Sequence, residues 1–179
     1  DDGGYSLVPT LPNPYTGDPD DDLFWRASSA VGGSPGANDP EPAASGIVIN
    51  EVLAHTDLPL EDAIEVRNIG TNAVNISGWY LSDSLANLKK FQIPSISAIP
   101  AGGYRVVYAV SFSNAFLISE LGDESVYLSA ATNNNLTGYR STFSFVGAVA
   151  NGESHGRLTR SDGVVETAAM SNRSFGVDN

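Results

Sequence analysis

Short runs of alternating apolar and polar residues dominate most of the chain. In DAIEVRN (62–68), Ile64 and Val66 alternate with Glu65 and Arg67. This is the two-residue period of a half-buried β-strand. Six further runs have the length and composition of strands: IVINEVL (47–53), GWYLSD (78–83), KFQI (90–93), YRVVYAV (104–110), SVYLS (125–129) and YRSTFSFVG (139–147).

Turn-forming segments separate these runs, among them NIGTN, IPAGGY and NNNLTG. Their glycine, asparagine and proline residues favour tight changes of chain direction. Helical periodicity is weak, and residues 110–121 fit a short helix and an extended strand equally well. Many short strands joined by regular turns predict an all-β sandwich or barrel.

The segment VNISGWYLSD (74–83) holds the bulkiest apolar residue of this pattern. Ile76, Trp79 and Leu81 are expected to point into the core, and Tyr80 to turn outward. Burying the indole contributes on the order of 2–3 kcal/mol. An exposed Trp79 that stacks on sugars is the alternative, and the surrounding apolar alternation disfavours it.

Composition divides the chain near residue 45. Seven of the ten prolines and eight acidic residues lie within residues 1–42, together with a single basic residue, Arg26. We predict an irregular N-terminal segment (1–38), a linker rich in proline and glycine (39–46) and one β-domain (47–176).

The charge balance restricts the partners. The formal net charge is −12, from 21 acidic and 9 basic residues. Such a chain repels nucleic acid and anionic membranes, so we expect no nucleic-acid partner and no membrane insertion. The acidic excess suits solubility, cations or a basic partner. The absence of cysteine excludes disulfides, thiolate nucleophiles and cysteine-based zinc sites.

The two ends of the chain resemble each other. DDGGYSLVPT (1–10) is similar to NGESHGRLTR (151–160), and WRASSAVGGSPG (25–36) is similar to ETAAMSNRSFG (166–176). One interpretation is that residues 1–38 hold the closing strands of a truncated preceding copy of the domain. The other is that two segments rich in glycine and serine look alike by composition. The strand-forming residues YSLV (5–8) are expected to pack on the chain's own domain.

Three carboxylates come nearest to a catalytic group. Glu51 and Glu65 can meet across adjacent strands, with Asp62 close by in sequence, and a glycosidase needs two carboxyl groups about 5–10 Å apart. We favour the simpler interpretation that these are solvent-facing residues alternating with apolar ones, with Arg67 as an ion-pair partner for either glutamate.

Two other motifs have weak support. The run GDPDDDLFW (17–25) contains Asp18, Asp20, Asp21 and Asp22, but it lacks the glycine and the closing glutamate of an EF-hand calcium loop. The sequence therefore leaves open whether the Asp18–Asp22 loop binds calcium.

Ser154, His155 and Asp162 contain the residue types of a hydrolytic triad. No G-x-S-x-G elbow accompanies them, and residues adjacent in sequence rarely form a triad. His55 lies in a loop between the first two predicted strands. We assign no catalytic, cofactor-binding or metal-binding residue.

Residues 47–108 carry an ordered series of motifs: INEV, DAIEVRN, VNISGWYLSD, KFQIP and PAGGY. This series resembles the lamin tail domain family, in the form found in bacterial extracellular proteins. The likeness extends loosely over residues 46–176, and Ala63 departs from it by standing where the family usually has Trp or Phe. The resemblance implies an immunoglobulin-like β-sandwich and a non-catalytic module attached to other domains.

Three functional hypotheses follow. The first is an interaction or structural module of a larger secreted or cell-surface protein, with further domains joined covalently and a protein or cell-surface partner. The second is a calcium-dependent carbohydrate-binding module, which predicts that Tyr80, Tyr104 or Tyr139 is exposed on a shallow face. The third is a hydrolase, which predicts a deep pocket that holds two carboxylates.

Overall fold

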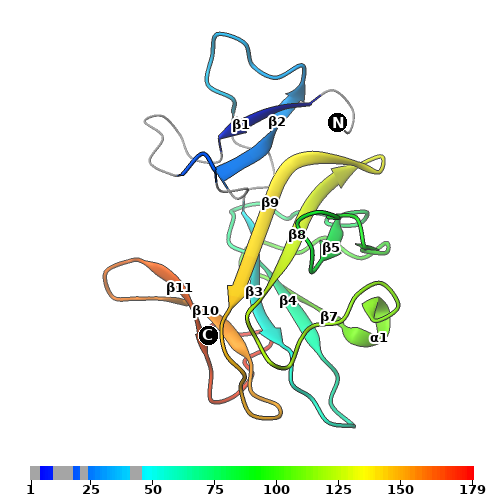
Figure 1. The fold of residues 1–179 in the computed structure, drawn as a ribbon, viewed down its shortest axis with the longest axis vertical. Helices are drawn as coiled ribbons and strands as arrows, with labels where there is room; N and C mark the ends of the chain where they lie inside the picture. The colour runs from blue at the N-terminus through cyan, green and yellow to red at the C-terminus, as the bar shows by residue number, and fades with distance from the viewer. Residues whose placement is uncertain (1–4, 10–17, 21–23, 41–45) are drawn as a thin grey trace.

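The computed structural model describes residues 5–9, 18–20, 24–40 and 46–179. Two antiparallel sheets face each other as a β-sandwich, and a separate two-stranded ribbon lies at one end (Figure 1). The elements are β1 (Tyr5–Pro9), β2 (Trp25–Val31), β3 (Ile47–Leu53), β4 (Ala63–Asn68), β5 (Tyr80–Ser82), β6 (Phe91–Gln92), β7 (Tyr104–Tyr108), α1 (Ala109–Phe112), β8 (Glu124–Thr132), β9 (Asn135–Phe145), β10 (His155–Thr159) and β11 (Val165–Ala169).

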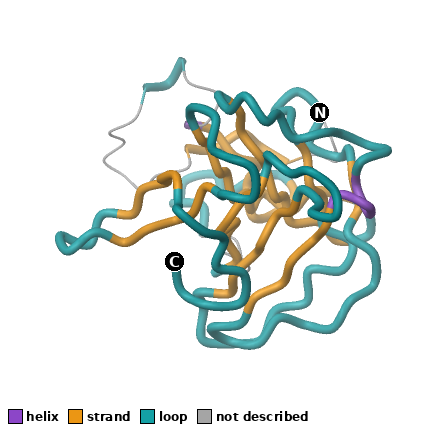
Figure 2. The backbone as a smooth tube through the Cα atoms, turned by 90° about the horizontal axis from the view of Figure 1, so that it is seen from below, coloured by secondary structure: helices purple, strands orange, loops and turns teal. Residues whose placement is uncertain are grey.

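The first sheet has the strand order β11-β10-β3-β4-β7 and the second has the order β6-β5-β8-β9. β10 and β11 form a hairpin that projects from the body of the sandwich (Figures 1 and 2). The all-β fold predicted from the apolar alternation is confirmed, as is the sandwich that the family resemblance implied, and all seven predicted runs contain a strand.

The core lies between the two sheets and follows the predicted alternation. Ile64 and Val66 of β4 are fully buried against Leu81 of β5 and Phe143 of β9. Trp79 enters this core with 5% of its surface exposed, as predicted, and its ring lies 6.0 Å from that of Tyr139.

Tyr80 does not turn outward as predicted, because only 8% of its surface is exposed. It faces away from Leu81, but β5 lies between β6 and β8, and the neighbouring Gln92 covers it. The Gln92 Nε2 donates to the Tyr80 hydroxyl at 3.1 Å and to Asn134 Oδ1 at 2.8 Å. Alternation gives the face of a residue, but it does not say whether that face meets water.

Two segments differ from the strand predictions. The chain turns into the short helix α1 directly after Tyr108, so Ala109 and Val110 leave the predicted strand (104–110), and the helix enters the segment 110–121, whose sequence fits both a short helix and a strand. The N-terminal segment is more regular than predicted, because β1 and β2 pair as an antiparallel ribbon. No helix among the described residues has the length and hydrophobicity that crossing a bilayer requires.

Candidate functional site

Glu51 of β3 and Glu65 of β4 are directly paired across the two strands. The prediction that these glutamates face solvent is wrong, because both are fully buried. A β-bulge at Asn50 sets the direction of the Glu51 side chain. It reverses the alternation of β3, so that Val52 points into the core and Glu51 points to the outer face of the sheet. The chain's last ten residues then cover this outer face.

The covering segment, which we call the C-terminal segment (residues 170–179), is anchored on Glu51. The Ser174 hydroxyl donates to Glu51 Oε2 at 2.9 Å, and the Ser174 backbone N–H donates to Oε1 at 2.9 Å. From β10's side, the Ser154 hydroxyl donates to Oε1 at 2.6 Å. Both oxygens of this carboxylate therefore accept hydrogen bonds, as a buried charge requires.

Glu65 forms the second anchor. Its Oε2 accepts a 2.6 Å hydrogen bond from the Gly176 backbone N–H, and its Oε1 accepts one from Asn50 Nδ2 at 2.9 Å. Burial raises the pKa of Glu65 above its usual range, and the neighbouring Glu51 adds to this effect, while the two hydrogen bonds and Arg67 oppose it. Both carboxyl groups are thus held by hydrogen-bond donors rather than by a directly bonded cation.

Asn179 completes the attachment of the C-terminal segment. Its Nδ2 donates to the backbone oxygens of Asn50 and Arg157, at 3.1 and 3.0 Å. A side chain at Gly156 would collide with Asn179 in this position, because a Cβ atom there would lie 2.7 Å from Asn179 Nδ2. Arg67 pairs with Asp178 at 2.5 Å, and not directly with either glutamate as predicted.

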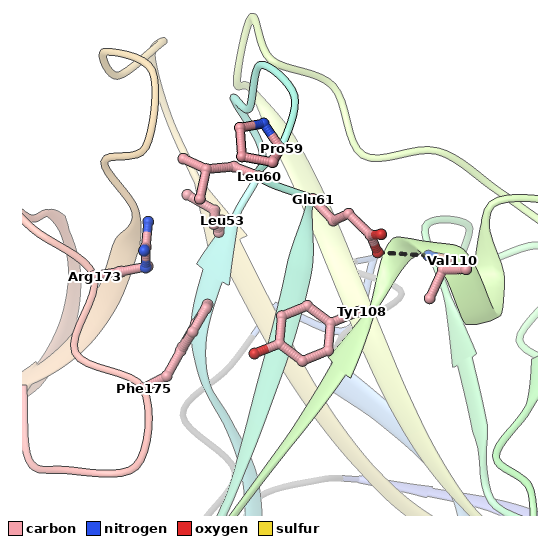
Figure 3. A pocket seen from close by; sticks show the side chains of 8 residues that line it. All are labelled: Leu53, Pro59, Leu60, Glu61, Tyr108, Val110, Arg173 and Phe175. Atoms are coloured by element: carbon pink, nitrogen blue, oxygen red, sulfur yellow. Dashed lines mark hydrogen bonds between the residues drawn. The ribbon is translucent and has the colours of Figure 1, made fainter.

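The anchored segment forms one wall of a groove of about 410 Å³ on the outer side of the sheet (Figure 3). Phe175 stands between the anchor residues Ser174 and Gly176, and its ring meets that of Tyr108 edge-on at 6.5 Å. The other lining residues are Leu53, Pro59, Leu60, Glu61, Val110 and Arg173.

The groove combines apolar walls with two charged groups. Tyr108 and Val110 have exposed fractions of 46% and 73%. Glu61 accepts a hydrogen bond from the Val110 N–H at 3.3 Å, whereas Arg173 is exposed on the opposite wall (Figure 3). Such a surface can hold an apolar side chain and pair with an anionic group beside it.

The third carboxylate, Asp62, takes part in a different cluster. It accepts a 2.6 Å hydrogen bond from the Thr56 hydroxyl, and its electrostatic neighbours are Glu120 and His55. Burial raises the pKa of Asp62. The imidazole of His55 donates from Nδ1 to the Val149 carbonyl at 2.7 Å, and its Nε2 lies 4.0 Å from Glu120.

The Ser154, His155 and Asp162 residues do not form a triad. Ser154 donates to Glu51, while the His155 ring packs at 4.9 Å from that of Phe145. Asp162 lies in the β10–β11 turn, where it accepts a hydrogen bond from the Val164 N–H and pairs with Arg160. Burial lowers the pKa of His155, as expected for an imidazole in an apolar contact.

The three tyrosines suggested for sugar binding are separately engaged. Tyr80 is buried on β5, and Tyr139 donates its hydroxyl to the Ile47 carbonyl. Tyr104 lies under the guanidinium of Arg67 and donates its hydroxyl to Asp178 at 2.9 Å. These residues do not provide the shallow aromatic face that the carbohydrate hypothesis predicted.

The Asp18–Asp22 loop lies partly outside the described residues, since Asp21 and Asp22 are not among them. Asp18 accepts a hydrogen bond from the Asp20 N–H at 3.0 Å. Within the described parts of the chain, no group of three or more His, Cys, Asp or Glu side chains could hold a metal ion.

Sequence reasoning missed the groove and the role of the C-terminal segment. Phe175 and Arg173 belong to NRSFG, a short motif without strand periodicity. The one available signal was an isolated bulky aromatic residue among small and polar ones near the end of the chain. Its partners, Leu53 and Tyr108, lie far away in sequence.

Comparison with known proteins agrees with this architecture. The model of the Lamin Tail Domain family matches residues 40–165, which is well over half of the chain. Neither the curated proteins nor the solved structures contain a significant match.

Proposed function

Because this chain belongs to the lamin tail domain family, we propose that it is a non-catalytic interaction module of a larger secreted or cell-surface bacterial protein. It binds a protein partner in the groove between β3, β7 and the C-terminal segment. The extracellular placement rests on the resemblance of residues 47–108 to the bacterial extracellular form of the family.

One observation carries the proposal: hydrogen bonds to the two buried glutamates anchor the groove wall from beneath. The anchors Ser174 and Gly176 bind the buried carboxylates, and the residues beside them, Arg173 and Phe175, line the groove. A wall fixed before binding lowers the entropy lost on association. Aromatic and arginine side chains are also the types that contribute most to protein interfaces.

The state of the carboxylates supports a non-catalytic role. Glu51 and Glu65 are sealed beneath the C-terminal segment, and both oxygens of each side chain accept hydrogen bonds. A glycosidase holds its two carboxyl groups open to a substrate that lies between them. The glutamate pair is better explained as an anchor than as a catalytic dyad.

The groove defines the chemistry of the partner. An aliphatic or aromatic side chain can pack against the rings of Tyr108 and Phe175, and a carboxylate next to it can pair with Arg173. The net charge of −12 favours a partner surface that is otherwise basic. We therefore expect a protein segment with one acidic and one bulky apolar residue close together.

A random peptide library displayed on phage tests this prediction. Peptides selected on the unmodified protein are expected to carry an Asp or Glu near a bulky apolar residue. Their binding should weaken at least tenfold on Arg173→Ala, because losing a charge-assisted pair costs on the order of 1.5–3 kcal/mol.

Arg160→Ala is the matched control. Arg160 is an exposed arginine of the β10–β11 turn, remote from the groove lining. Equal binding of the selected peptides to the unmodified protein and to the Arg173→Ala variant contradicts the proposal, as does equal weakening by both arginine variants.

A further inference from the structure

The described residues 5–9 and 24–39 fold into a unit equivalent to residues 155–179; we call these two parts the N-terminal unit and the closing unit. Each contains an antiparallel hairpin with the same strand register over three consecutive pairs. These pairs are Leu7–Ala27, Val8–Arg26 and Pro9–Trp25 in the first, and Arg157–Thr167, Leu158–Glu166 and Thr159–Val165 in the second. The residue numbers of the two sets differ by a constant 150 on the first strand of each hairpin and by a constant 140 on the second strand.

The equivalence continues into the turn after each hairpin. The Ala37 N–H donates to the Ser34 carbonyl at 3.1 Å, as the Val177 N–H does to the Ser174 carbonyl at 3.1 Å. Gly36 and Gly176 occupy the matching position, with φ of +77° and +85°.

The serine that opens each turn also has matching contacts. Ser34 Oγ lies 3.1 Å from Asp39 Oδ2, and Ser174 Oγ lies 2.6 Å from Asn179 Oδ1. Asp39 and Asn179 are again related by the difference of 140. Similar composition explains why the two sequences look alike. It does not explain why the same strand register, the same turn and the same side-chain contact follow one another in the same order.

The two units differ in what they contact. The closing unit is built into the sandwich through β3 and the glutamate pair. The N-terminal unit lies on β9 instead: the Arg140 Nη2 donates to the Trp25 carbonyl at 3.3 Å, and Gly138 approaches so closely that a Cβ would lie 2.4 Å from the Ala27 oxygen.

β9 covers β2 of the N-terminal unit, whereas β11 of the closing unit touches β9 of its own domain only near its other end, where the Thr167 hydroxyl donates to the Ser144 carbonyl at 2.7 Å. Trp25, Arg26 and Ala27 of β2 are buried or half-buried, whereas their counterparts on β11, Val165, Glu166 and Thr167, are exposed. The arginine Arg26 of β2 corresponds to the glutamate Glu166 of β11, and this change of charge favours a contact between β11 and β9 of a further copy. Arg26 and Arg140 line the same cavities, and a glutamate in place of Arg26 would face Arg140 with opposite charge.

We propose that the N-terminal unit is the closing unit of a preceding copy of this domain, and that its contact with β9 is the joint between consecutive copies. The exposed face of β11 is then the docking site for β9 of a further copy. This head-to-tail contact uses a different surface from the groove, so it stands independently of the peptide-binding proposal.

A fusion of residues 5–179 followed directly by residues 40–179 tests the proposal, because Asn179 occupies the position of Asp39. Each copy retains its own core, since the buried cluster draws on residues 47–145. The chain has no cysteine, so introduced cysteines are unique. Thr167→Cys in the first copy and Leu136→Cys in the second should be joined by a short bis-maleimide cross-linker.

The pair Ala27→Cys and Leu136→Cys in the single chain calibrates the yield, because both residues line one small cavity between β2 and β9. The fusion should reach a comparable yield and lose most of it when Gly138→Ala is placed in the second copy. Leu58→Cys in the first copy, at a fully exposed loop position, is the control that should not cross-link.

Small-angle X-ray scattering of the fusion without cysteines supplies a second readout. Docked copies scatter as one compact body, and Gly138→Ala in the second copy should increase the radius of gyration. Two copies that tumble independently, with a radius unaffected by that substitution, overturn the proposal whatever the cross-linking yield.

Discussion

Ser174→Ala isolates the anchor between the C-terminal segment and the buried carboxylates. The substitution removes the hydroxyl that donates to Glu51 Oε2 at 2.9 Å, and this carboxyl group is fully buried. A hydrogen bond to a charged group contributes about 1.5–3 kcal/mol. Glu51 keeps the Ser154 hydroxyl and the Ser174 N–H as donors, so we expect the lower part of this range, about 2 kcal/mol.

For a domain of this size, such a loss lowers the melting temperature by roughly 4–8 °C. Urea denaturation followed by circular dichroism gives the free energy of unfolding, and hydrogen exchange at the Gly176 amide reports the release of the segment itself. Both readouts should move together, because Glu65 accepts a hydrogen bond from that amide.

Ser34→Ala is the matched control, because Ser34 occupies the equivalent turn without a glutamate pair beneath it. Its hydroxyl donates to Asp39, which also accepts from Arg26 and Ser29. We expect a loss of about 0.5 kcal/mol or less. Equal effects of the two substitutions, or a Ser174→Ala variant as stable as the unmodified protein, would refute the anchoring role of the carboxylates.

Two further predictions concern ionisation and metal. Burial raises the pKa of Glu65, so the folded state binds this proton more tightly than the unfolded state. The resulting stabilisation is complete below the ordinary value of 4.5 and is lost as pH rises through the raised pKa. The stability of Glu65→Gln relative to the unmodified protein should therefore increase from about pH 4 to about pH 7 in urea denaturation, and a difference that stays constant with pH contradicts this. Excess calcium should leave the melting temperature within about 1 °C of the value with excess chelator, since a ligand that binds only the folded state raises it. A rise of several degrees that Asp18→Asn with Asp20→Asn abolishes would support the calcium-dependent alternative.

The sequence by itself determined the seven strands β3 to β9 and the centre of the core. Period-two alternation in DAIEVRN and around Trp79 reflects a property of each strand, namely that successive side chains point to opposite faces. The same local information identified the family through ordered motifs, and it indicated the likeness between residues 1–36 and 151–176. These features depend on neighbouring residues, so a single chain read in order contains them.

Tertiary structure alone decided which faces meet water. Glu51 and Glu65 look like exposed strand residues, but a segment more than 100 residues later in the chain covers them. The bulge at Asn50 also shifts the register of β3, and this decides which face of the sheet Glu51 occupies. Tyr80 was predicted to be exposed for the same reason. The groove needed Phe175, Tyr108 and Leu53 to come together from distant positions. Alternation distinguishes the two faces of a strand, but burial depends on what packs against each face, and that is settled only when the whole chain has folded.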